Sequence, residues 1–202
     1  MFGLQLSTLT GKEKIYSTPK PIESKDLPEQ YSFNDFIKSV KDQGRTNKCV
    51  PMAISQVVEW YWRTCGMEKA SVDVDHLFSA RTSEEGMSFL QAFDFMKMVG
   101  YRLNGVPETL KGFYMIPSRL LMQEHLVSSA PFLAALPVCN SQNTAFWRGS
   151  SVEGYHAVAV TGYSREGLIF VNSWGYSYGN GGFGLIPWSE ISAVKEAWGM
   201  LL

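Results

Sequence analysis

The chain has 202 residues, of which 45% are hydrophobic and 18% are charged, as in an ordinary soluble globular protein. This length allows one sizeable domain or two small lobes that share an interface. The 18 basic and 19 acidic side chains leave a net charge of −1 and form no basic stripe, so nucleic acid is not an expected partner. The longest clearly apolar run, residues 131–138, is far too short to cross a membrane.

The N-terminus and the cysteines indicate a reducing compartment. The first residues lack the charged, apolar and small-residue regions of a secretory signal, so we expect the protein in the cytoplasm. The three cysteines are too few for a disulfide framework, and we interpret Cys65 and Cys139 as small buried apolar residues. No CxxC or HExxH motif is present, so neither a metal nor another cofactor is predicted.

An extended arm precedes the folded domain. Residues 1–26 contain prolines and several charges and show weak periodicity. We expect the domain to occupy residues 27–202. The sequence leaves open whether the arm serves to dock a partner.

The first half of the domain is predicted to be mainly helical. Apolar residues recur at three- and four-residue steps from Cys49 onward, with Pro51 in the first turn and Gly66 just past the end. A second helix is expected over residues 88–99. A third, weaker helix is expected over about residues 118–129.

The second half of the domain changes to short β-rich segments bounded by Gly, Asn, Ser or Pro. The predicted strands are residues 131–138, 155–163, 167–173 and 182–187. Helices followed by strands indicate an α+β fold with two lobes, a helical lobe over about residues 31–120 and a β-rich lobe over about residues 121–202. A cleft between two such lobes is a natural place for a functional site.

One cysteine stands where a loop meets the start of the first predicted helix. Backbone N–H groups at a helix N-terminus carry partial positive charge, so they stabilise a thiolate of Cys49 and should lower its pKa. A thiolate is the nucleophile that attacks an amide carbonyl. The same N–H groups can donate to the oxyanion that forms next, and Gln43, six residues upstream, offers a side-chain amide donor.

The β-rich half supplies a histidine and an asparagine. His156 opens an alternating strand, and Asn172 begins the sequence Asn-Ser-Trp-Gly. An asparagine oxygen can accept from one imidazole nitrogen and fix the ring, so that the other nitrogen faces Cys49. Trp174 can cover that hydrogen bond and keep water away from it.

These segments, in this order, resemble the papain family of cysteine peptidases. The matches are Gln43 with Cys49, His156 at the head of HAVAVTGY, and the run NSWGYSYGNGGFGLI from Asn172. The similarity extends over about residues 27–186. It implies a papain-like two-lobed fold, in which a helical lobe and a β-barrel-like lobe enclose the active-site cleft.

The resemblance also implies the chemistry. Cys49 and His156 would form a thiolate–imidazolium pair, and Asn172 would orient the imidazole. Gln43 and the Cys49 N–H would form the oxyanion hole. Peptide bonds of a protein or peptide substrate would then be hydrolysed through a thioester acyl-enzyme.

The chain departs from the family pattern in ways that indicate a short, disulfide-free member of bacterial or phage type. Thr46 replaces the first cysteine of the active-site loop, so the usual disulfide cannot form, and Val50 replaces the aromatic residue after the nucleophile. The histidine and the asparagine follow Cys49 at shorter spacings than in papain, which implies trimmed loops. If the chain is phage-encoded, a virion-associated location is the alternative to the cytoplasm.

Some residues are expected, by resemblance, to contact substrate. Gly86 is the clear remnant of the strip that pairs with substrate backbone, and Trp174 borders the cleft. Ala134, Ala135 and Gly154 are expected to line the neighbouring pocket, where small side chains leave room for a bulky apolar substrate residue.

Two other functions stay open. The altered loop around Cys49 and the arm also fit a catalytically silent papain-fold module that binds or supports a larger assembly. The Cys-His-Asn set also supports other acyl transfers, such as those of a peptidoglycan amidase or a transacylase. The two remaining histidines, His76 and His125, are interpreted as structural or surface groups on helical stretches.

Overall fold

The computed structural model describes residues 3–17, 22–138 and 152–202, so the prediction for Cys139 lies outside the described residues. The helices are α1 (Cys49–Thr64), α2 (Val74–Phe78), α3 (Phe89–Met98) and α4 (Arg119–Ser128). Short 3₁₀ helices cover Ser24–Asp26, Asn34–Phe36 and Trp188–Ala193. The strands are β1 (Tyr31–Ser32), β2 (Tyr101–Leu103), β3 (Val106–Glu108), β4 (Gly112–Met115), β5 (Phe132–Val138), β6 (Gly154–Tyr163), β7 (Gly167–Val171), β8 (Phe183–Pro187) and β9 (Glu196–Leu201).

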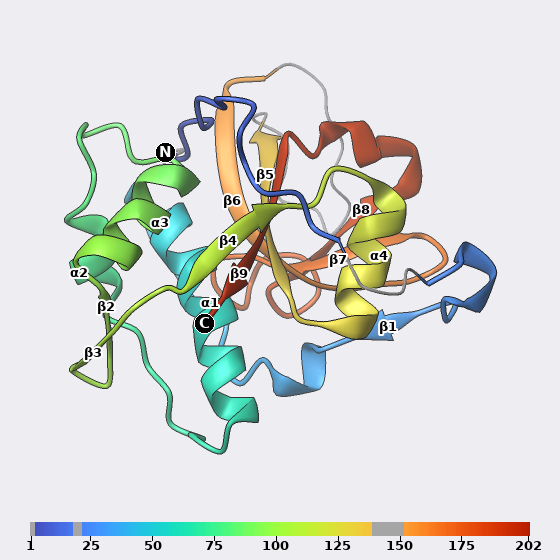
Figure 1. The fold of residues 1–202 in the computed structure, drawn as a ribbon, viewed down its shortest axis with the longest axis horizontal. Coiled ribbons are helices and arrows are strands. Elements are labelled where there is room, and N and C mark those ends of the chain that lie inside the picture. The colour runs from blue at the N-terminus through green and yellow to red at the C-terminus, as the bar shows by residue number, and fades with distance from the viewer. Residues whose placement is uncertain (1–2, 18–21, 139–151) are drawn as a thin grey trace.

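A seven-stranded antiparallel sheet forms the centre of the molecule (Figure 1). Its strands follow the order β4-β9-β5-β6-β7-β8, and β1 pairs with β6. Helices α1, α2 and α3 gather on one side of the molecule, and α4 lies at the other (Figure 1). Within the described residues β4 and β8 do not pair with each other, so the sheet is open. The result is the mixed α+β architecture that the sequence predicts.

The long periodic segments were predicted well. The helices α1, α3 and α4 and the strands β5 to β8 each begin and end within two residues of their predicted limits. Ser88 caps α3 because its hydroxyl accepts from the Gln91 N–H while the Gln91 side chain accepts from the Ser88 N–H. Pro51 lies in the first turn of α1, where its missing N–H costs no helical hydrogen bond.

Other elements escaped prediction because they are short or contain residues atypical of strands. They are α2, the β2–β3 hairpin, β4 and β9. Gly199 interrupts the apolar pattern of β9, but the Tyr114 ring of β4 occupies the space that a side chain would need there. Because β1 and β4 join the sheet from before residue 121, that residue is not a sharp limit between helical and β-rich parts.

The helix α1 buries its apolar face, and the chain becomes exposed just after the helix ends. Its predicted apolar residues pack into the core against β6: Val50, Ala53, Ile54, Val57 and Val58. Cys65, which follows the last turn, is exposed. The expectation that Cys65 is a buried apolar residue is therefore wrong. The chain leaves the core at the end of α1, so this side chain faces solvent.

A buried carboxylate ties α1 to two loops. Glu59 is 2% exposed and bonds Lys41 Nζ at 2.6 Å and Arg63 Nη2 at 3.1 Å. The Val72 N–H also donates to the Glu59 carboxylate. Because both cations are themselves largely buried, removal of the carboxylate leaves charges without a partner in a region of low dielectric constant.

We predict that Glu59→Ala lowers the free energy of unfolding by about 3 kcal/mol. Glu23→Ala is the matched control, since Glu23 forms an exposed ion pair with Lys25 and should change stability by less than about 1 kcal/mol. Urea unfolding of the two variants and the parent checks this. Equal stabilities would show that the Glu59 carboxylate does not hold α1 in place.

The N-terminal arm is anchored along the edge of the sheet. The Tyr16 N–H donates to the Met115 carbonyl, and the Met115 N–H donates to the Lys14 carbonyl, both at 2.8 Å. The Tyr16 ring stacks on Tyr114 with centroids 5.4 Å apart, and its hydroxyl lies 3.0 Å from the Ser128 hydroxyl. The arm is therefore part of the folded structure.

A neutral histidine lies beneath this anchor. The His125 side chain is fully buried, and its Nε2 lies 2.9 Å from the Tyr114 hydroxyl. Tyr16 contacts the ring edge-on. Burial lowers the pKa of His125 from 6.5 to about 4, because a charged imidazole would be poorly solvated here. His125 is thus a structural residue, which is one of the two alternatives that the sequence leaves open.

This histidine should make the fold sensitive to acid. Between about pH 6.5 and pH 4 the unfolded chain protonates His125 whereas the folded chain does not, so stability falls as the pH is lowered through that range. In His125→Gln this loss should be smaller by about 3 kcal/mol. His76→Gln, at a half-buried histidine, is the control. Urea unfolding at pH 7 and pH 4 measures the difference, and equal losses in parent and His125→Gln would contradict it.

Candidate active site

Cys49 is the first residue of α1 and lies where the helix meets β6. The N–H groups of Cys49 and Val50 approach the sulfur, as expected at a helix start, and each acts to lower the thiol pKa. The side chain is nevertheless fully buried. Burial dominates and raises the pKa of Cys49 to about 11.

The predicted histidine and asparagine meet because of the sheet register. The strands β6 and β7 are antiparallel, and Ala159 pairs with Val171. The beginning of β6 therefore lies beside the end of β7, where His156 and Asn172 stand. His156 Nε2 lies 2.7 Å from Asn172 Oδ1, and both side chains are fully buried.

An indole covers this hydrogen bond. The Trp174 ring lies with its centroid 4.6 Å from that of His156 and tilts by 32° to it. Burial lowers the pKa of His156 to about 4, although the hydrogen bond to Asn172 acts in the opposite direction. The ring is therefore oriented by an amide but neutral.

Gln43 is positioned by the segment that follows Asn172. The Gln43 N–H donates to the Ser173 carbonyl at 2.8 Å, and the Ser173 hydroxyl donates to Gln43 Oε1 at 2.6 Å. Gln43 Nε2 donates one hydrogen to the Thr46 carbonyl at 2.8 Å. Among the residues that the structure describes, no acceptor takes its second hydrogen, which stays available for another group.

The sulfur and the imidazole are neighbours but are not hydrogen-bonded. The N–H of Ala157, the residue after His156, approaches the Cys49 sulfur. His156 Nδ1 is buried and has no hydrogen-bond partner among the described residues. The resemblance implies a charged pair, whereas in this state burial favours a neutral thiol and a neutral ring.

The cause of this burial is the N-terminal arm, which lies across the site as an added extended segment. The Leu4 N–H donates to the Tyr155 carbonyl at 3.4 Å, and the Gln5 N–H donates to the Met87 carbonyl at 3.1 Å. The Met87 N–H donates in return to the Gly3 carbonyl at 3.0 Å. The Gly3 N–H also approaches the Cys49 sulfur.

The arm fits this place only because glycines occupy two positions at which a side chain would collide with backbone. A side chain on Gly86, whose φ is +128°, would overlap the Gly3 carbonyl. A side chain on Gly3 would overlap the backbone of Asn47, two residues before Cys49. Gly86 thus lies where the arm backbone approaches the site, and its neighbour Met87 makes the hydrogen bonds to the arm.

Leu4 occupies an apolar position beside the site. Its side chain is 4% exposed and belongs to the same buried cluster as Met87, Ala135 and Ala157. Ala134 belongs to the cluster on the opposite face of the sheet, so its expected place in this pocket is wrong, because neighbouring residues of a strand point to opposite faces. Gly154 lies at the beginning of β6, opposite Val138, and is half-buried.

Three supporting residues were missed by the sequence analysis. Ser173 holds Gln43, the Gln56 side chain of α1 donates to the Asn172 carbonyl at 3.2 Å, and Met87 pairs with the arm. Gln56 lies among the apolar residues of α1, and a polar residue at a buried helical position is the one signal that points to it. The pairing of Met87 is non-local and leaves no pattern in the sequence.

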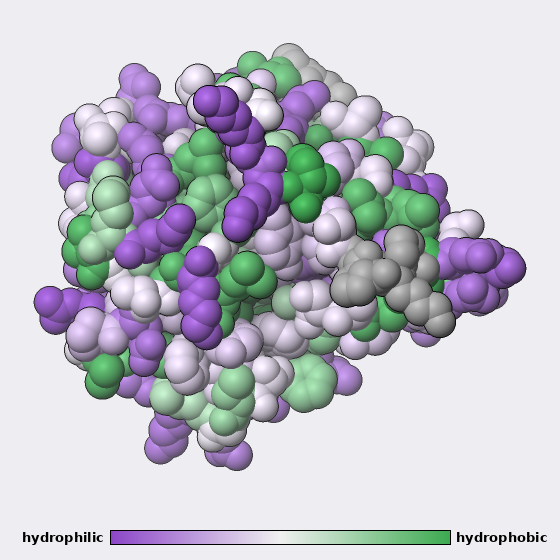
Figure 2. Space-filling model, in the orientation of Figure 1, coloured by the Kyte–Doolittle hydropathy of each residue, from purple (hydrophilic) through white to green (hydrophobic). Residues whose placement is uncertain are grey.

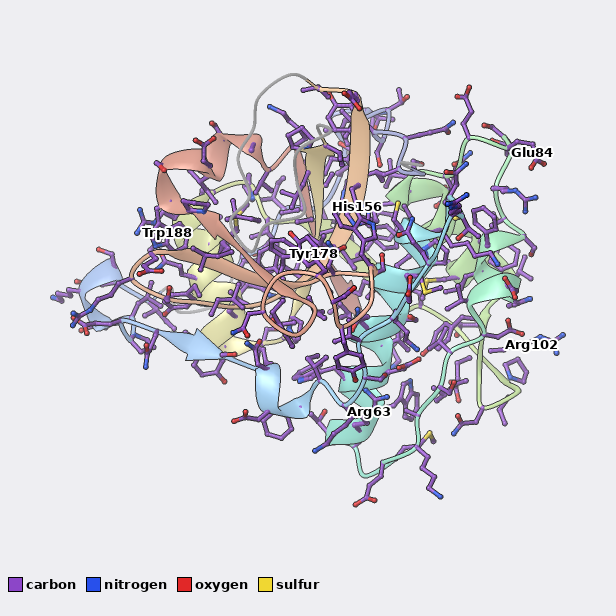
Figure 3. The ribbon with its side chains drawn as sticks, turned by 180° about the vertical axis from the view of Figure 1, so that it is seen from behind. Arg63, Glu84, Arg102, His156, Tyr178 and Trp188 are labelled. Carbon is purple, nitrogen blue, oxygen red and sulfur yellow. The ribbon has the colours of Figure 1, made fainter. Side chains whose placement is uncertain are left out.

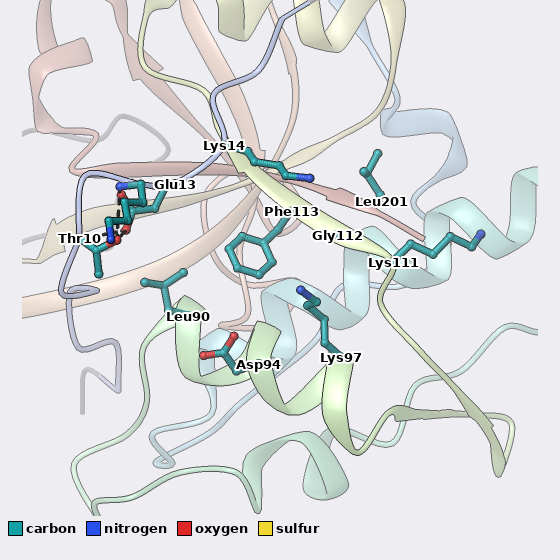
Figure 4. A pocket seen from close by; sticks show the side chains of 11 residues that line it. Thr10, Glu13, Lys14, Leu90, Asp94, Lys97, Lys111, Gly112, Phe113 and Leu201 are labelled. Carbon is teal, nitrogen blue, oxygen red and sulfur yellow. Dashed lines mark hydrogen bonds between the residues drawn. The ribbon is translucent and has the colours of Figure 1, made fainter.

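A separate pocket of about 350 Å³ lies between the arm and the helical side of the molecule (Figure 4). Phe113 and Leu90 contribute apolar surface to it, and four lysines surround it: Lys12, Lys14, Lys97 and Lys111. None of the predicted catalytic residues lines this pocket. Hydrophilic and apolar side chains are interspersed over the face that the arm crosses (Figure 2).

Within residues 3–17, 22–138 and 152–202, no group of three or more His, Cys, Asp or Glu side chains is placed to hold a metal ion. In the same residues, no helix has both the length and the apolar composition needed to cross a membrane.

No protein-family model and no curated protein matches the sequence. Solved structures match the fold over most of the chain. Xylellain, a cysteine protease from Xylella fastidiosa, superposes with a TM-score of 0.82 at 16% identity, covering 98% of this chain and 95% of that one. Procathepsin B S9 from Trypanosoma congolense gives 0.85 at 14% identity, over 98% and 85%. The Carica candamarcensis cysteine protease CMS1MS2, in complex with E-64, gives 0.72 at 19% identity, over 86% and 98%.

The fold is papain-like. The superposition with the first two structures extends over nearly the whole chain, so it takes in residues of the arm as well as the domain. At these identities the comparison shows the architecture, and the roles of individual side chains rest on the geometry of the site.

We predict that Gly3→Val releases the arm, because the new side chain overlaps the Asn47 backbone. Alkylation of Cys49 by iodoacetamide should then become at least about tenfold faster, since a buried thiol reacts only after local opening. Peptide mass mapping separates Cys49 from the other cysteines. Thr8→Val, at an exposed arm residue, should leave the rate unchanged, and an equal rate in all three proteins would show that the arm does not protect the thiol.

Proposed function

We propose that this protein is a cysteine peptidase held latent by its own N-terminal arm. Cys49 is the nucleophile, His156 its base, and Asn172 the residue that orients the base. The observation that carries the proposal is the 2.7 Å hydrogen bond between His156 and Asn172, made within a papain-like fold beside the cysteine that begins α1.

The proposed reaction starts with proton transfer from the Cys49 thiol to His156 Nδ1, which has no other partner among the described residues. The thiolate attacks the carbonyl carbon of the substrate, and the Cys49 N–H and the second hydrogen of Gln43 Nε2 donate to the oxyanion. The C–N bond then breaks and His156 protonates the leaving amine. Water, deprotonated by His156, hydrolyses the thioester and restores the thiol.

Latency is supported by the energetics of the covered site. With the arm in place, burial raises the thiol pKa to about 11 and lowers the imidazole pKa to about 4, so proton transfer from sulfur to ring is unfavourable. Withdrawal of residues 3–5 admits water, which removes the main cause of both shifts. The N–H groups at the start of α1 then act on the thiolate without that opposition.

The same contacts support a peptide or protein substrate. A substrate that replaces the arm gains backbone hydrogen bonds to Met87 and Tyr155. A bulky apolar side chain of the substrate takes the place of Leu4 beside Ala135. We place the arm at residues 1–26 and the substrate-processing domain at residues 27–202.

The full burial of Cys49 favours one alternative, a silent papain-fold module whose cleft the arm keeps closed. In that case Cys49→Ala would leave the biological role intact. A peptidoglycan amidase or transacylase would use the same residues, and a comparison of peptides with cell-wall fragments as substrates separates these activities from a peptidase.

The proposal predicts that an epoxide inactivator of papain-type enzymes forms a covalent adduct on Cys49, and forms it faster in Gly3→Val. Gly3→Val should hydrolyse peptides with a bulky apolar residue near the scissile bond. Cys49→Ala in that background should abolish hydrolysis. Asn172→Ala should lower kcat/KM by about a hundredfold, since the base loses its orientation.

Mass spectrometry of the adduct and peptide-hydrolysis assays provide the measurements. Cys65→Ser is the control, because this exposed cysteine lies at the far end of α1 from Cys49 and should keep full activity. The peptidase proposal fails if the released protein forms no adduct on Cys49 and cleaves no peptide.

A further inference from the structure

A buried tyrosine lies beside the amide that orients His156. Tyr178 is 1% exposed, and its ring packs edge-on against Trp174 with centroids 5.2 Å apart. Trp174 in turn covers His156. Figure 3, which labels His156 and Tyr178, shows them near each other in the interior of the molecule.

The loop after β7 holds Tyr178 in place. The Tyr178 N–H donates to the Gly175 carbonyl at 3.3 Å, and the Gly182 N–H donates to the Tyr178 carbonyl at 2.7 Å. The Asn172 N–H donates to the Gly182 carbonyl at 2.9 Å. These backbone bonds fold the loop back on itself, so the segment that carries Tyr178 returns toward Asn172.

The two ends of the Asn172 amide are unequally satisfied. Oδ1 accepts from His156 Nε2 and from the Ser173 N–H, at 2.7 and 2.8 Å. Among the residues that the structure describes, the buried Nδ2 lacks a partner at hydrogen-bonding geometry, and so does the buried Tyr178 hydroxyl. The amide nitrogen can only donate, and the phenol oxygen can accept, so each group supplies what the other lacks.

Electrostatics support the proximity of these two groups. Burial raises the pKa of Tyr178 to about 12, and the Asn172 side chain acts against that rise, as an amide donor close to the phenol oxygen does. The two buried groups therefore lie close enough for the amide to influence the phenol.

We propose that the Tyr178 oxygen accepts a hydrogen bond from Asn172 Nδ2, which makes Tyr178 a positioning residue for His156. The oxygen and nitrogen ends of an asparagine amide have nearly the same shape, so packing alone does not select between them. The Ser173 N–H favours the orientation in which Oδ1 faces His156, and the Tyr178 oxygen adds to that preference by accepting from Nδ2. If the amide turned over, an N–H group would face His156 Nε2 and favour the tautomer that carries its proton on Nδ1. That tautomer cannot accept the proton of Cys49.

The inference rests on the proposed function for its catalytic consequence, but its structural part is testable without turnover. The chain has three histidines, so the ring nitrogens of His156 can be assigned by NMR in the full-length protein. In Tyr178→Phe the packing against Trp174 is kept and only the hydroxyl is lost. The Nε2 proton of His156 should exchange with solvent about fivefold faster, and the Nδ1-protonated tautomer should increase.

Tyr163→Phe is the matched control. Tyr163 is also a buried tyrosine, but its hydroxyl donates to the Pro28 carbonyl and it lies at the other end of β6. This variant should leave the His156 ring signals unchanged. A Tyr178→Phe spectrum that matches the parent in tautomer and exchange rate would overturn the proposal.

The unsubstituted protein offers a second measurement, which holds even if Tyr178→Phe does not fold. One Nδ2 proton of Asn172 should exchange slowly, because it is engaged with the phenol oxygen. Rapid exchange of both protons would contradict the assignment.

Kinetic measurements distinguish the positioning role of Tyr178 from the proposed peptidase activity. In the Gly3→Val background, Tyr178→Phe should lower kcat about fivefold with little change in KM, and Tyr163→Phe should not. Altered His156 signals in a protein without peptidase activity would leave the positioning role standing while the proposed function fails. If Tyr178→Phe keeps full peptidase activity and unaltered His156 signals, the proposed function stands and the positioning role of Tyr178 fails.

Discussion

The hydrogen bond between His156 and Asn172 is the interaction on which the site depends, and the sheet creates it. Antiparallel pairing brings the beginning of β6 to the end of β7, so residues 16 positions apart in the chain meet at 2.7 Å. The helical part of the molecule reaches the same point, because Gln56 of α1 donates to the Asn172 carbonyl. Asn172 therefore connects the helix that begins with Cys49 to the strand that carries His156.

The arm determines the chemical state of this arrangement. Three backbone hydrogen bonds and the Leu4 side chain remove the site from water, and desolvation then outweighs the helix N–H groups at Cys49 and the amide at His156. The two side chains that the resemblance expects to form a charged pair are neutral in this covered state. Under the proposed function, the arm therefore controls both the access of substrate to the site and the protonation states of Cys49 and His156.

The sequence predicts those parts of the fold that follow local periodicity. The start of α1 at Cys49, the capping of α3 by Ser88 and the four central strands all produce patterns within a few residues. The spacing and the sequence motif also predict that Asn172 orients the imidazole of His156. These features could be predicted because each is encoded by adjacent residues.

The features that escaped prediction are encoded by residues that lie far apart in the chain. The docking of Gly3 against Asn47 and Gly86 depends on three backbones meeting, and no single segment carries a signal for it. The place of Tyr178 is hidden in a glycine-rich loop without periodicity. The exposure of Cys65 reflects where the chain leaves α1, a property of the assembled fold and not of the residue type.

Because the arm belongs to the same chain as the site that it covers, the inhibition that we propose is a matter of effective concentration. A segment tethered by a short connection competes as if present at roughly millimolar concentration, however dilute the protein is. Dilution therefore cannot open the cleft, and a free peptide must either exceed that concentration or bind much more tightly than the few contacts of residues 3–5. A single cut in the connection would convert the arm into an ordinary ligand that diffuses away, which makes the opening of the cleft effectively irreversible in a dilute solution.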